Sequence, residues 1–406
     1  MVGFKGRKLF VAAQGPKEDT VDDFWRMIWE QKCQIVIMAT NLHEKYRTMC
    51  YKYWPEEPDS LSRTYGLIEV TTVETIVYPE YTIRTFRIAN TQERRSSRAS
   101  VLESPSSGSA SPDQESVSGT RLVVQYHYTT WNDYRAPDCT IGLLRFIQRV
   151  RRLDNYDAAP VVVHCSAGVG RTGTFIAIDA MMDQMAQERI VDIFGFVSGL
   201  RRQRNFMVQS LEQYVFVYKA LAEWYLFGDT DIEAENIQQH IASLKQPRSG
   251  SDISGIKAEF EELSRTLEDN RLSDFAHKEH NCAKNRYDNV VPYDRNRVIL
   301  APMVGHLDAS YINASVVQGY FRPYYLAQDP LPDTIRDFWR MIWEHNISTI
   351  VMLSDEADFM SSEFYWPLDA MSTITLSDRD QLMIQWLGEE ESPFYLTRRM
   401  NLSSSK

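Results

Sequence analysis

A long internal repeat constrains the fold of this 406-residue chain more than any other feature of its sequence. The segment DFWRMIWE occurs at residues 23–30 and again, without change, at residues 337–344. The agreement extends outwards, from AQGP against AQDP before the segment to YWP in both copies after it. A repeat of this length indicates a duplicated domain.

Each copy predicts a helix followed by a strand. Phe, Met, Ile and Trp recur at helical spacing in the repeated segment, so we expect its tryptophans to lie in the core. These tryptophans are Trp25, Trp29, Trp339 and Trp343. Short apolar segments, 35–38 and 350–353, follow the two helices and predict strands. The alternation indicates an α/β fold, a mixed β-sheet flanked by helices, that is present twice.

The two copies are incomplete at opposite ends. Hardly anything precedes the repeated helix in the first copy, whereas a long segment with KNRY at residues 284–287 precedes it in the second. We therefore expect a first domain, 1–228, that lacks its N-terminal head, a linker, 229–255, and a second domain, 256–406, that is truncated at its C-terminal end. A domain that lacks part of its sheet buries less surface, so we expect the second domain to be poorly packed.

Composition and charge exclude several classes of protein. Hydrophobic residues make up 43% of the chain and charged residues 24%, which is typical of soluble globular proteins. No apolar run reaches the length that a membrane span requires, and the first residues lack the apolar core of a signal peptide. The net charge of −11 argues against nucleic acid as a partner, because binding to phosphate backbones depends on Lys and Arg.

The five cysteines indicate a reducing compartment. Their number is odd, their spacing is irregular, and no two of them form a CxxC pair, so the sequence predicts neither a disulfide framework nor a cysteine metal site. We therefore expect a cytoplasmic location.

A serine-rich insert interrupts the first copy at residues 94–120. It contains hardly any apolar side chains and cannot offset the entropy of its own ordering, so we expect a disordered loop. The segments on either side, 81–88 and 121–128, are rich in β-branched and aromatic residues, which is typical of strands. The insert is therefore predicted to lie between two strands.

The segment most informative about chemistry is VVVHCSAGVGRTG at residues 161–173. An apolar strand leads into a glycine-rich turn that opens a helix. Such a turn directs backbone N–H groups inward, and the helix N-terminus adds partial positive charge, so the site suits a phosphate. These donors and Arg171 favour the thiolate form of Cys165. Arg171 can hold two phosphoryl oxygens, and the Thr172 hydroxyl can stabilise the sulfur as it leaves.

The string HCSAGVGRTG, together with QGP, DFWRMIWE, YWP and the downstream Gln209, resembles the cysteine-dependent protein tyrosine phosphatases. The duplication resembles the receptor-type members with tandem cytoplasmic domains, and the segments 12–25 and 225–230 are most similar to the alpha and epsilon group. The resemblance covers nearly the whole chain apart from the insert. It implies the tyrosine phosphatase fold, a highly twisted mixed sheet flanked by helices, for both copies.

The resemblance implies that the chain hydrolyses phosphotyrosine on proteins in two steps. Cys165 attacks phosphorus to form a cysteinyl-phosphate, which water then hydrolyses, while Arg171 and the loop amides stabilise charge on the phosphoryl oxygens. Asp133 matches the aspartate of the family's mobile acid loop, which acts as general acid and then as base. Gln209 matches the glutamine that positions the water. The residues expected to contact substrate are Asp133, Cys165, Ser166, Ala167, Gly168, Val169, Gly170, Arg171, Gln209 and Gln213.

Three departures from the family pattern keep a second hypothesis open. Asn132 replaces the proline of the acid loop, and Met49 replaces a lysine that contacts the closed loop. The first copy also lacks the phosphotyrosine-recognition loop with its stacking tyrosine, while the second copy has the KNRY motif but no nucleophile. The alternative to an enzyme is therefore a catalytically weak or inactive remnant that binds phosphotyrosine as a scaffold. A dual-specificity phosphatase is a third hypothesis, which the YWP and DFWRMIWE segments disfavour.

The predicted chemistry requires neither a metal nor a cofactor, because the protein supplies both the nucleophile and the charge stabilisation. The expected partners are phosphotyrosine-containing proteins. By resemblance, the intact receptor would lie at the cytoplasmic face of the plasma membrane, held there by parts absent from this chain. The sequence leaves homodimerisation open.

Overall fold

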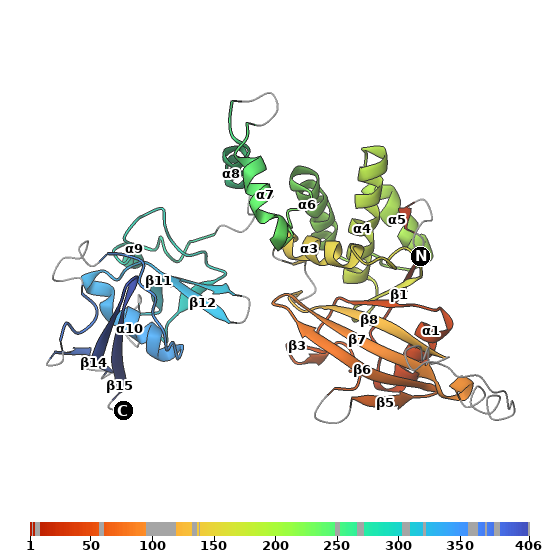
Figure 1. Cartoon of the computed structure of the whole chain (residues 1–406), viewed down its shortest axis with the longest axis horizontal. Coiled ribbons are helices and arrows are strands. Elements are labelled where there is room, and N and C mark those ends of the chain that lie inside the picture. The colour runs from red at the N-terminus through yellow and green to blue at the C-terminus, as the bar shows by residue number, and fades with distance from the viewer. Residues whose placement is uncertain are drawn as a thin grey trace, which may run out of the picture. The chain divides into compact units, whose positions relative to one another are not determined.

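The chain folds into two compact units, Met1–Thr266 and Leu267–Lys406 (Figure 1). The sequence suggests a linker at 229–255, whereas in the structure this segment carries a short turn η3 (Ala234–Asn236) and helix α7 (Ile237–Leu244) within the first unit, which also includes helix α8 (Gly255–Arg265). The computed structural model describes residues 1, 3–4, 9–56, 61–94, 119–131, 136–137, 139–247, 252–265, 272–302, 309–319, 322–355, 364–369, 372–376 and 382–404.

Unit 1 is built on a mixed sheet, which in its described residues has seven strands. In spatial order these are β1 (Phe10–Ala13), β9 (Val161–His164), β2 (Ile35–Met38), β8 (Thr120–Tyr128), β7 (Tyr81–Asn90), β6 (Ile68–Val77) and β5 (Ser62–Tyr65). The first four run parallel, and the pairs from β8 to β5 are antiparallel. The predicted mixed sheet is therefore confirmed. A separate two-stranded ribbon consists of β3 (His43–Glu44) and β4 (Arg47–Thr48).

Helices cover both faces of this sheet, because its central strands are apolar on both sides. Ile37, Val161 and Val163 face one helical layer, and the alternate residues Val36 and Val162 face the other. The second layer contains α1 (Val21–Glu30), which follows a short turn η2 (Glu18–Thr20). The first layer contains α3 (Thr140–Arg151), α4 (Gly170–Glu188), α5 (Ile193–Gln203) and α6 (Leu211–Phe227).

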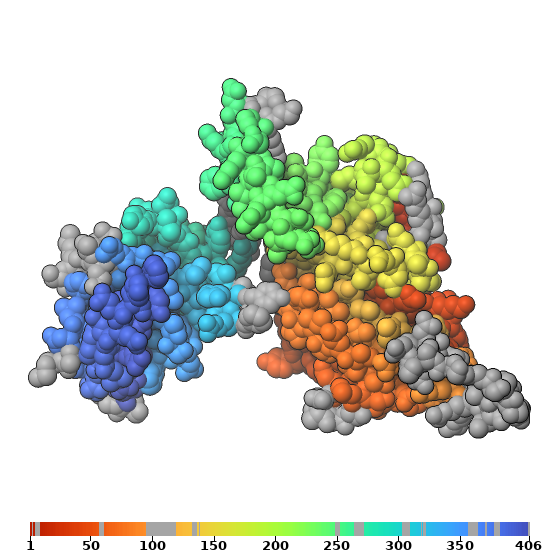
Figure 2. Space-filling model, in the orientation of Figure 1, coloured from red at the N-terminus to blue at the C-terminus, as the bar shows by residue number. Residues whose placement is uncertain are grey.

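Helix α4 is the innermost helix of the first layer. Every residue from Gly170 to Met182 is buried, so this part of the helix packs on all sides rather than along one stripe. In the space-filling view the strands of unit 1 (orange) and the helices above them (yellow to green) form one packed body (Figure 2). Among the described residues no helix is both long and apolar enough to cross a membrane.

Strands β7 and β8 flank the serine-rich insert, so the two strands predicted there are confirmed. They pair antiparallel, and Ala89 near the end of β7 lies opposite Thr120 at the start of β8. Residues 95–118, for which the sequence predicts disorder, lie outside the described residues.

Unit 2 repeats the local geometry of unit 1 around the duplicated helix. The indole Nε1 of Trp25 donates to the carbonyl of Tyr53 at 2.7 Å, and that of Trp339 donates to the carbonyl of Tyr365 at 2.6 Å. Both tryptophans are buried, as predicted. Trp343, however, is 44% exposed, so the expectation that it lies in the core is wrong. The elements of unit 2 are α9 (Glu279–Cys282), β10 (Arg297–Ile299), β11 (Tyr311–Gln318), β12 (Pro323–Ala327), η4 (Pro332–Thr334), α10 (Ile335–Glu344), β13 (Thr373–Leu376), β14 (Leu382–Ser392) and β15 (Tyr395–Ser404).

The strand predicted at residues 350–353 does not form. Val351 and Leu353 are 76% and 94% exposed, whereas Ile350 and Met352 pack, partly buried, against the core of unit 2. The matching strand of unit 1, β2, lies between β8 and β9 and forms a hydrogen-bond ladder with both. The described part of unit 2 provides no counterpart of these neighbours, and a short apolar segment without them has no partners for its backbone. Unit 2 nevertheless has a hydrophobic core, centred on Trp339, Tyr365 and Trp366.

Candidate active site

Cys165 lies at the carboxyl end of β9, in the middle of the parallel half of the sheet. Ligands bind in α/β sheets at this edge, where loops leave the strands. The loop that follows, 165–169, joins β9 directly to the N-terminus of α4. The strand, turn and helix predicted from the sequence are therefore present, and they carry Cys165 next to the positive end of a helix dipole.

The sulfur of Cys165 receives two hydrogen bonds from its own loop and helix. The backbone N–H of Gly168 and the hydroxyl of Thr172 each donate to Sγ at 3.2 Å. The residue is only 5% exposed. Donors aimed at a sulfur stabilise negative charge on it.

Two glycines allow the AQGP segment to lie against the nucleophile loop. Gly168 has a φ of +69°, and a Cβ there would lie 2.0 Å from the carbonyl oxygen of Ala13. A Cβ on Gly15 would lie 2.7 Å from the carbonyl oxygen of Cys165. The N–H of Gly15 donates to the carbonyl of Ser166 at 2.9 Å. The repeated AQGP segment of the first copy is therefore a support for this loop.

Arg171 is held by a buried carboxylate, that of Glu44 in β3. Its two terminal nitrogens donate to the two oxygens of Glu44 at 2.6 and 2.7 Å, and only 6% and 10% of these side chains is exposed. Burial disfavours the charged carboxylate, but the hydrogen bonds and charge of Arg171 and the N–H of Asn41 together hold the pKa of Glu44 below its ordinary value. The guanidinium also lies 5.8 Å from the ring centroid of Trp131. The ion pair fixes the guanidinium plane beside the loop.

A second arginine, Arg204, supports the loop from outside. Its Nε donates to the carbonyl of Gly168 at 2.8 Å, and its Nη2 donates to the carbonyl of Ala167 at 3.2 Å. Because the N–H and C=O groups of a peptide point in opposite directions, carbonyls held toward Arg204 turn the neighbouring N–H groups away from it. Neither Arg204 nor Glu44 was predicted from the sequence, since neither lies in the motif.

The two glutamines predicted for the site lie next to each other at the start of α6. The side-chain oxygen of Gln213 accepts from the backbone N–H groups of Gln209 and Ser210 at 3.0 and 3.3 Å. A Cβ on Gly170 would lie 2.9 Å from that oxygen, so Gln213 also packs against the nucleophile loop. The side chain of Gln209 is exposed. Gln213 thus fixes the backbone from which Gln209 projects.

The acid loop is described only in part. Trp131 is fully buried against Phe216, with 6.3 Å between ring centroids, whereas Asn132 and Asp133 lie outside the described residues. The predicted acid, Asp133, therefore has no measured distance to Cys165. Trp131, two residues before Asp133, lies close to Arg171.

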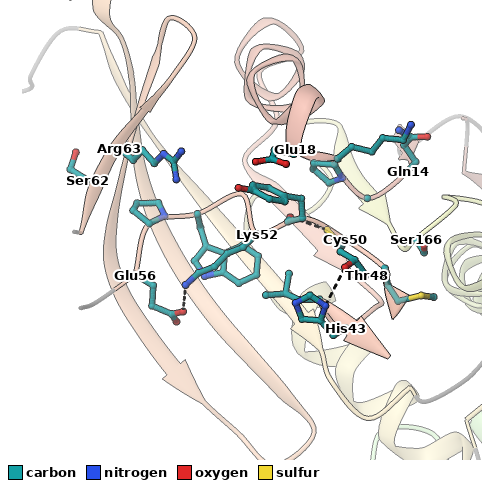
Figure 3. Close-up of a pocket in the computed structure, with 18 residues that line it drawn as sticks. Gln14, Glu18, His43, Thr48, Cys50, Lys52, Glu56, Ser62, Arg63 and Ser166 are labelled. Carbon is teal, nitrogen blue, oxygen red and sulfur yellow. Dashed lines mark hydrogen bonds and ion pairs between the residues drawn. The ribbon is translucent and has the colours of Figure 1, made fainter. Parts of the chain in front are cut away.

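A pocket of about 890 Å³ opens beside the nucleophile loop, lined by Ser166 of that loop and by Gly15 of the AQGP segment (Figure 3). Charged side chains surround it, among them Lys52, which pairs with Glu56 at 2.9 Å, and Arg63. Met49, which stands where the family pattern has a lysine, also lines this pocket.

The KNRY motif of the second copy packs within unit 2. The N–H of Arg286 donates to the side-chain oxygen of Gln328, and the side-chain nitrogen of Gln328 donates to the carbonyl of Lys284, both at 2.9 Å. The Lys284 ammonium pairs with Asp337 at 2.7 Å. The motif therefore rests on the AQDP segment and on the duplicated helix.

Comparison with known proteins identifies the family. The model described as protein-tyrosine phosphatase matches residues 1–223 and 281–406. The chain belongs to the protein-tyrosine phosphatase family. Its two matching segments confirm the tandem arrangement predicted from the repeat.

Curated relatives of this phosphatase chain include receptor-type proteins. It is 44% identical, over 98% of its length, to a receptor-type tyrosine-protein phosphatase of Caenorhabditis elegans, of which it covers 31%. It is 42% identical, over 91% of its length, to receptor-type tyrosine-protein phosphatase epsilon of Mus musculus, of which it covers 50%. It is 38% identical, over its whole length, to receptor-type tyrosine-protein phosphatase alpha of Homo sapiens, of which it covers 47%. The chain thus spans half or less of these relatives, and the predicted resemblance to the receptor type is confirmed.

Proposed function

We propose that unit 1 is a protein tyrosine phosphatase that hydrolyses phosphotyrosine on proteins through a cysteinyl-phosphate at Cys165. One observation carries the proposal. The sulfur of Cys165 has an N–H and a hydroxyl directed at it, 3.2 Å away, at a helix N-terminus whose Arg171 is fixed by a buried carboxylate. Such a site stabilises a thiolate and, next to it, the charge of a phosphoryl group.

In the first step Sγ of Cys165 attacks phosphorus. The S–P bond forms as the bond from phosphorus to the tyrosine oxygen breaks, and the electron pair of that bond passes to the phenolic oxygen. Asp133 donates a proton to this oxygen, so that neutral tyrosine leaves. Arg171 and the loop N–H groups, from Ser166 to Arg171, bind the three remaining phosphoryl oxygens.

In the second step water attacks the phosphorus of the cysteinyl-phosphate. The Asp133 carboxylate accepts a proton from the water, the S–P bond breaks, and its electron pair returns to sulfur. The hydroxyl of Thr172 stabilises the thiolate as it leaves. Gln209 positions the water, and Gln213 supports it through the backbone hydrogen bonds described above.

The test uses p-nitrophenyl phosphate and a phosphotyrosyl peptide with the purified chain. We expect turnover by the wild type and none by Cys165→Ser, which keeps the shape of the site but lacks the thiolate. Asp133→Ala is expected to slow turnover while peptide binding persists. Wild-type activity no higher than that of Cys165→Ser, with peptide binding intact, would refute hydrolysis and leave the scaffold hypothesis that Met49 and Asn132 favour.

The wider assignments rest on the receptor-type relatives. We place residues 1–228 as the catalytic domain, because they contain the HCSAGVGRTG string, and residues 256–406 as part of a second tyrosine phosphatase-like domain. We assign the intact protein to the cytoplasmic face of the plasma membrane and its substrates to phosphotyrosine-containing proteins. Fractionation of cells that express the intact protein, probed with an antibody against unit 1, tests this location.

A further inference from the structure

A row of buried polar side chains leads from the middle of the sheet to the nucleophile loop. It begins at Arg84 in β7, passes through Gln125 in β8 and Tyr53, and ends at His164 in β9. The contacts are Arg84 Nη1 to Gln125 Oε1 at 3.0 Å, Gln125 Nε2 to the Tyr53 hydroxyl at 2.6 Å, and that hydroxyl to His164 Nε2 at 2.9 Å. Arg84 is 9% exposed and the other three are fully buried, so water cannot replace these partners.

The direction of every hydrogen bond in this row follows from its first member. A guanidinium only donates, so the amide of Gln125 must turn its oxygen to Arg84 and its NH₂ group to Tyr53. The oxygen of Tyr53 accepts that bond, and its own proton is then available for the Nε2 of His164. The other acceptor near the hydroxyl is the thioether of Met38 at 3.8 Å, which is a weak one.

His164 is neutral in this setting. Complete burial lowers the pKa of His164 to about 4, so near neutral pH the ring carries one proton. If Nε2 accepts from Tyr53, the proton is on Nδ1, which lies 3.3 Å from the carbonyl oxygen of Cys165. This tautomer pairs both ring nitrogens. The opposite tautomer would set the lone pair of Nδ1 against a carbonyl oxygen.

We propose that Arg84 and Gln125 are positioning residues that hold His164 in its Nδ1–H tautomer, and that this tautomer fixes the peptide plane between Cys165 and Ser166. With the Cys165 carbonyl directed at His164, the N–H of Ser166 points the opposite way, as a trans peptide requires. The row thus sets the orientation of the first amide of the phosphate-binding loop. The tautomer itself does not depend on the function proposed above, whereas its effect on turnover does.

The test is Gln125→Glu, which has nearly the same shape but removes the donor. A carboxylate at this position accepts from Arg84 and also from Tyr53, so the Tyr53 proton turns away from His164. We expect His164 to change to the Nε2–H tautomer, which ¹⁵N chemical shifts of labelled histidine report directly. We also expect alkylation of Cys165 by iodoacetate and kcat/KM for p-nitrophenyl phosphate to fall about tenfold, the effect of losing one hydrogen bond that orients the loop.

Gln239→Glu on the exposed face of α7 is the matched control for the added charge, and we expect it to leave tautomer, alkylation and turnover as in the wild type. The ¹⁵N chemical shifts of wild-type His164 test the proposed Nδ1–H tautomer even if Gln125→Glu does not fold. An Nε2–H tautomer in the wild type overturns the proposal. An unchanged tautomer in folded Gln125→Glu also overturns it. A changed tautomer with unchanged alkylation refutes the link to the loop. Absence of turnover in the wild type, with the tautomers of both proteins as expected, would count against the phosphatase assignment instead.

Discussion

We expect two buried histidines to make unit 1 sensitive to mild acid. His164 in β9 and His127 in β8 lie on either side of β2. Burial lowers the pKa of each from 6.5 to about 4, and the charge of Arg84 adds to the effect at His127. His127 donates through Nε2 to the carbonyl of Thr40 at 2.9 Å, and its Nδ1 lies 3.3 Å from Arg84. Both rings are therefore held in their neutral form by the fold.

The sign and size of the effect follow from linkage. Because the folded-state pKa is lower than that of the unfolded chain, the stabilising contribution is fully present above pH 6.5 and is lost as the pH falls toward 4. Between pH 7 and pH 5 the unfolded chain gains about 0.7 proton per histidine and the folded unit hardly any. The free energy of unfolding should then fall by about 2 kcal/mol for each histidine.

The assay is scanning calorimetry of the wild type and His127→Gln at pH 7 and pH 5. Glutamine keeps a donor for Thr40 and does not titrate, so the variant should lose about 2 kcal/mol less than the wild type over this range, or roughly 4–8 °C in the unit 1 transition. His240→Gln on α7 is the control, for which we expect the wild-type change. If His127→Gln and the wild type respond equally to pH, the account of buried neutral histidines is refuted.

Three substitutions test the supports of the nucleophile loop. Gly168→Ala should lower kcat/KM about 100-fold, because its Cβ would displace the loop from Ala13, and near-normal turnover would contradict the stated clash. Glu44→Gln should lower the free energy of unfolding in urea by about 3 kcal/mol and raise KM, since Arg171 loses its buried counter-charge. An unchanged urea midpoint and KM would argue against the ion pair. Gln213→Ala should destabilise the start of α6 by about 1 kcal/mol and slow hydrolysis of the cysteinyl-phosphate, visible as a larger burst of p-nitrophenol; an unchanged burst would separate Gln213 from the second step.

The local parts of this site could be predicted from the sequence, because they depend on neighbours in the chain. The turn after β9 needs Gly168 at a positive φ, and the helix that follows must begin at once, so the string at residues 161–173 already specifies strand, loop and donors. The strands on either side of the insert could likewise be predicted from their own composition. A structure that depends on consecutive residues can be predicted from their pattern in the sequence.

The long-range parts could not be predicted in this way. Glu44 and Arg171 are 127 positions apart, and no periodicity marks a glutamate in a short ribbon as the partner of an arginine in a helix. The strand predicted at 350–353 also depends on distant parts of the chain. Its apolar residues match those of β2, but a strand forms only where neighbouring strands pair with it. Trp343 is exposed whereas its counterpart in the first copy, Trp29, is partly buried, so the burial of a repeated tryptophan depends on what packs against it.

The pairing of Ala89 with Thr120 has a practical consequence for work on this protein. The two ends of the intervening segment leave β7 and β8 side by side, so the pairing of these strands does not depend on the length of the connection. The entropy cost of closing a longer connection rises only slowly. A fluorescent protein or an affinity tag could be spliced in at this point with both of its termini anchored, giving a reporter attached to the phosphatase body rather than to its end.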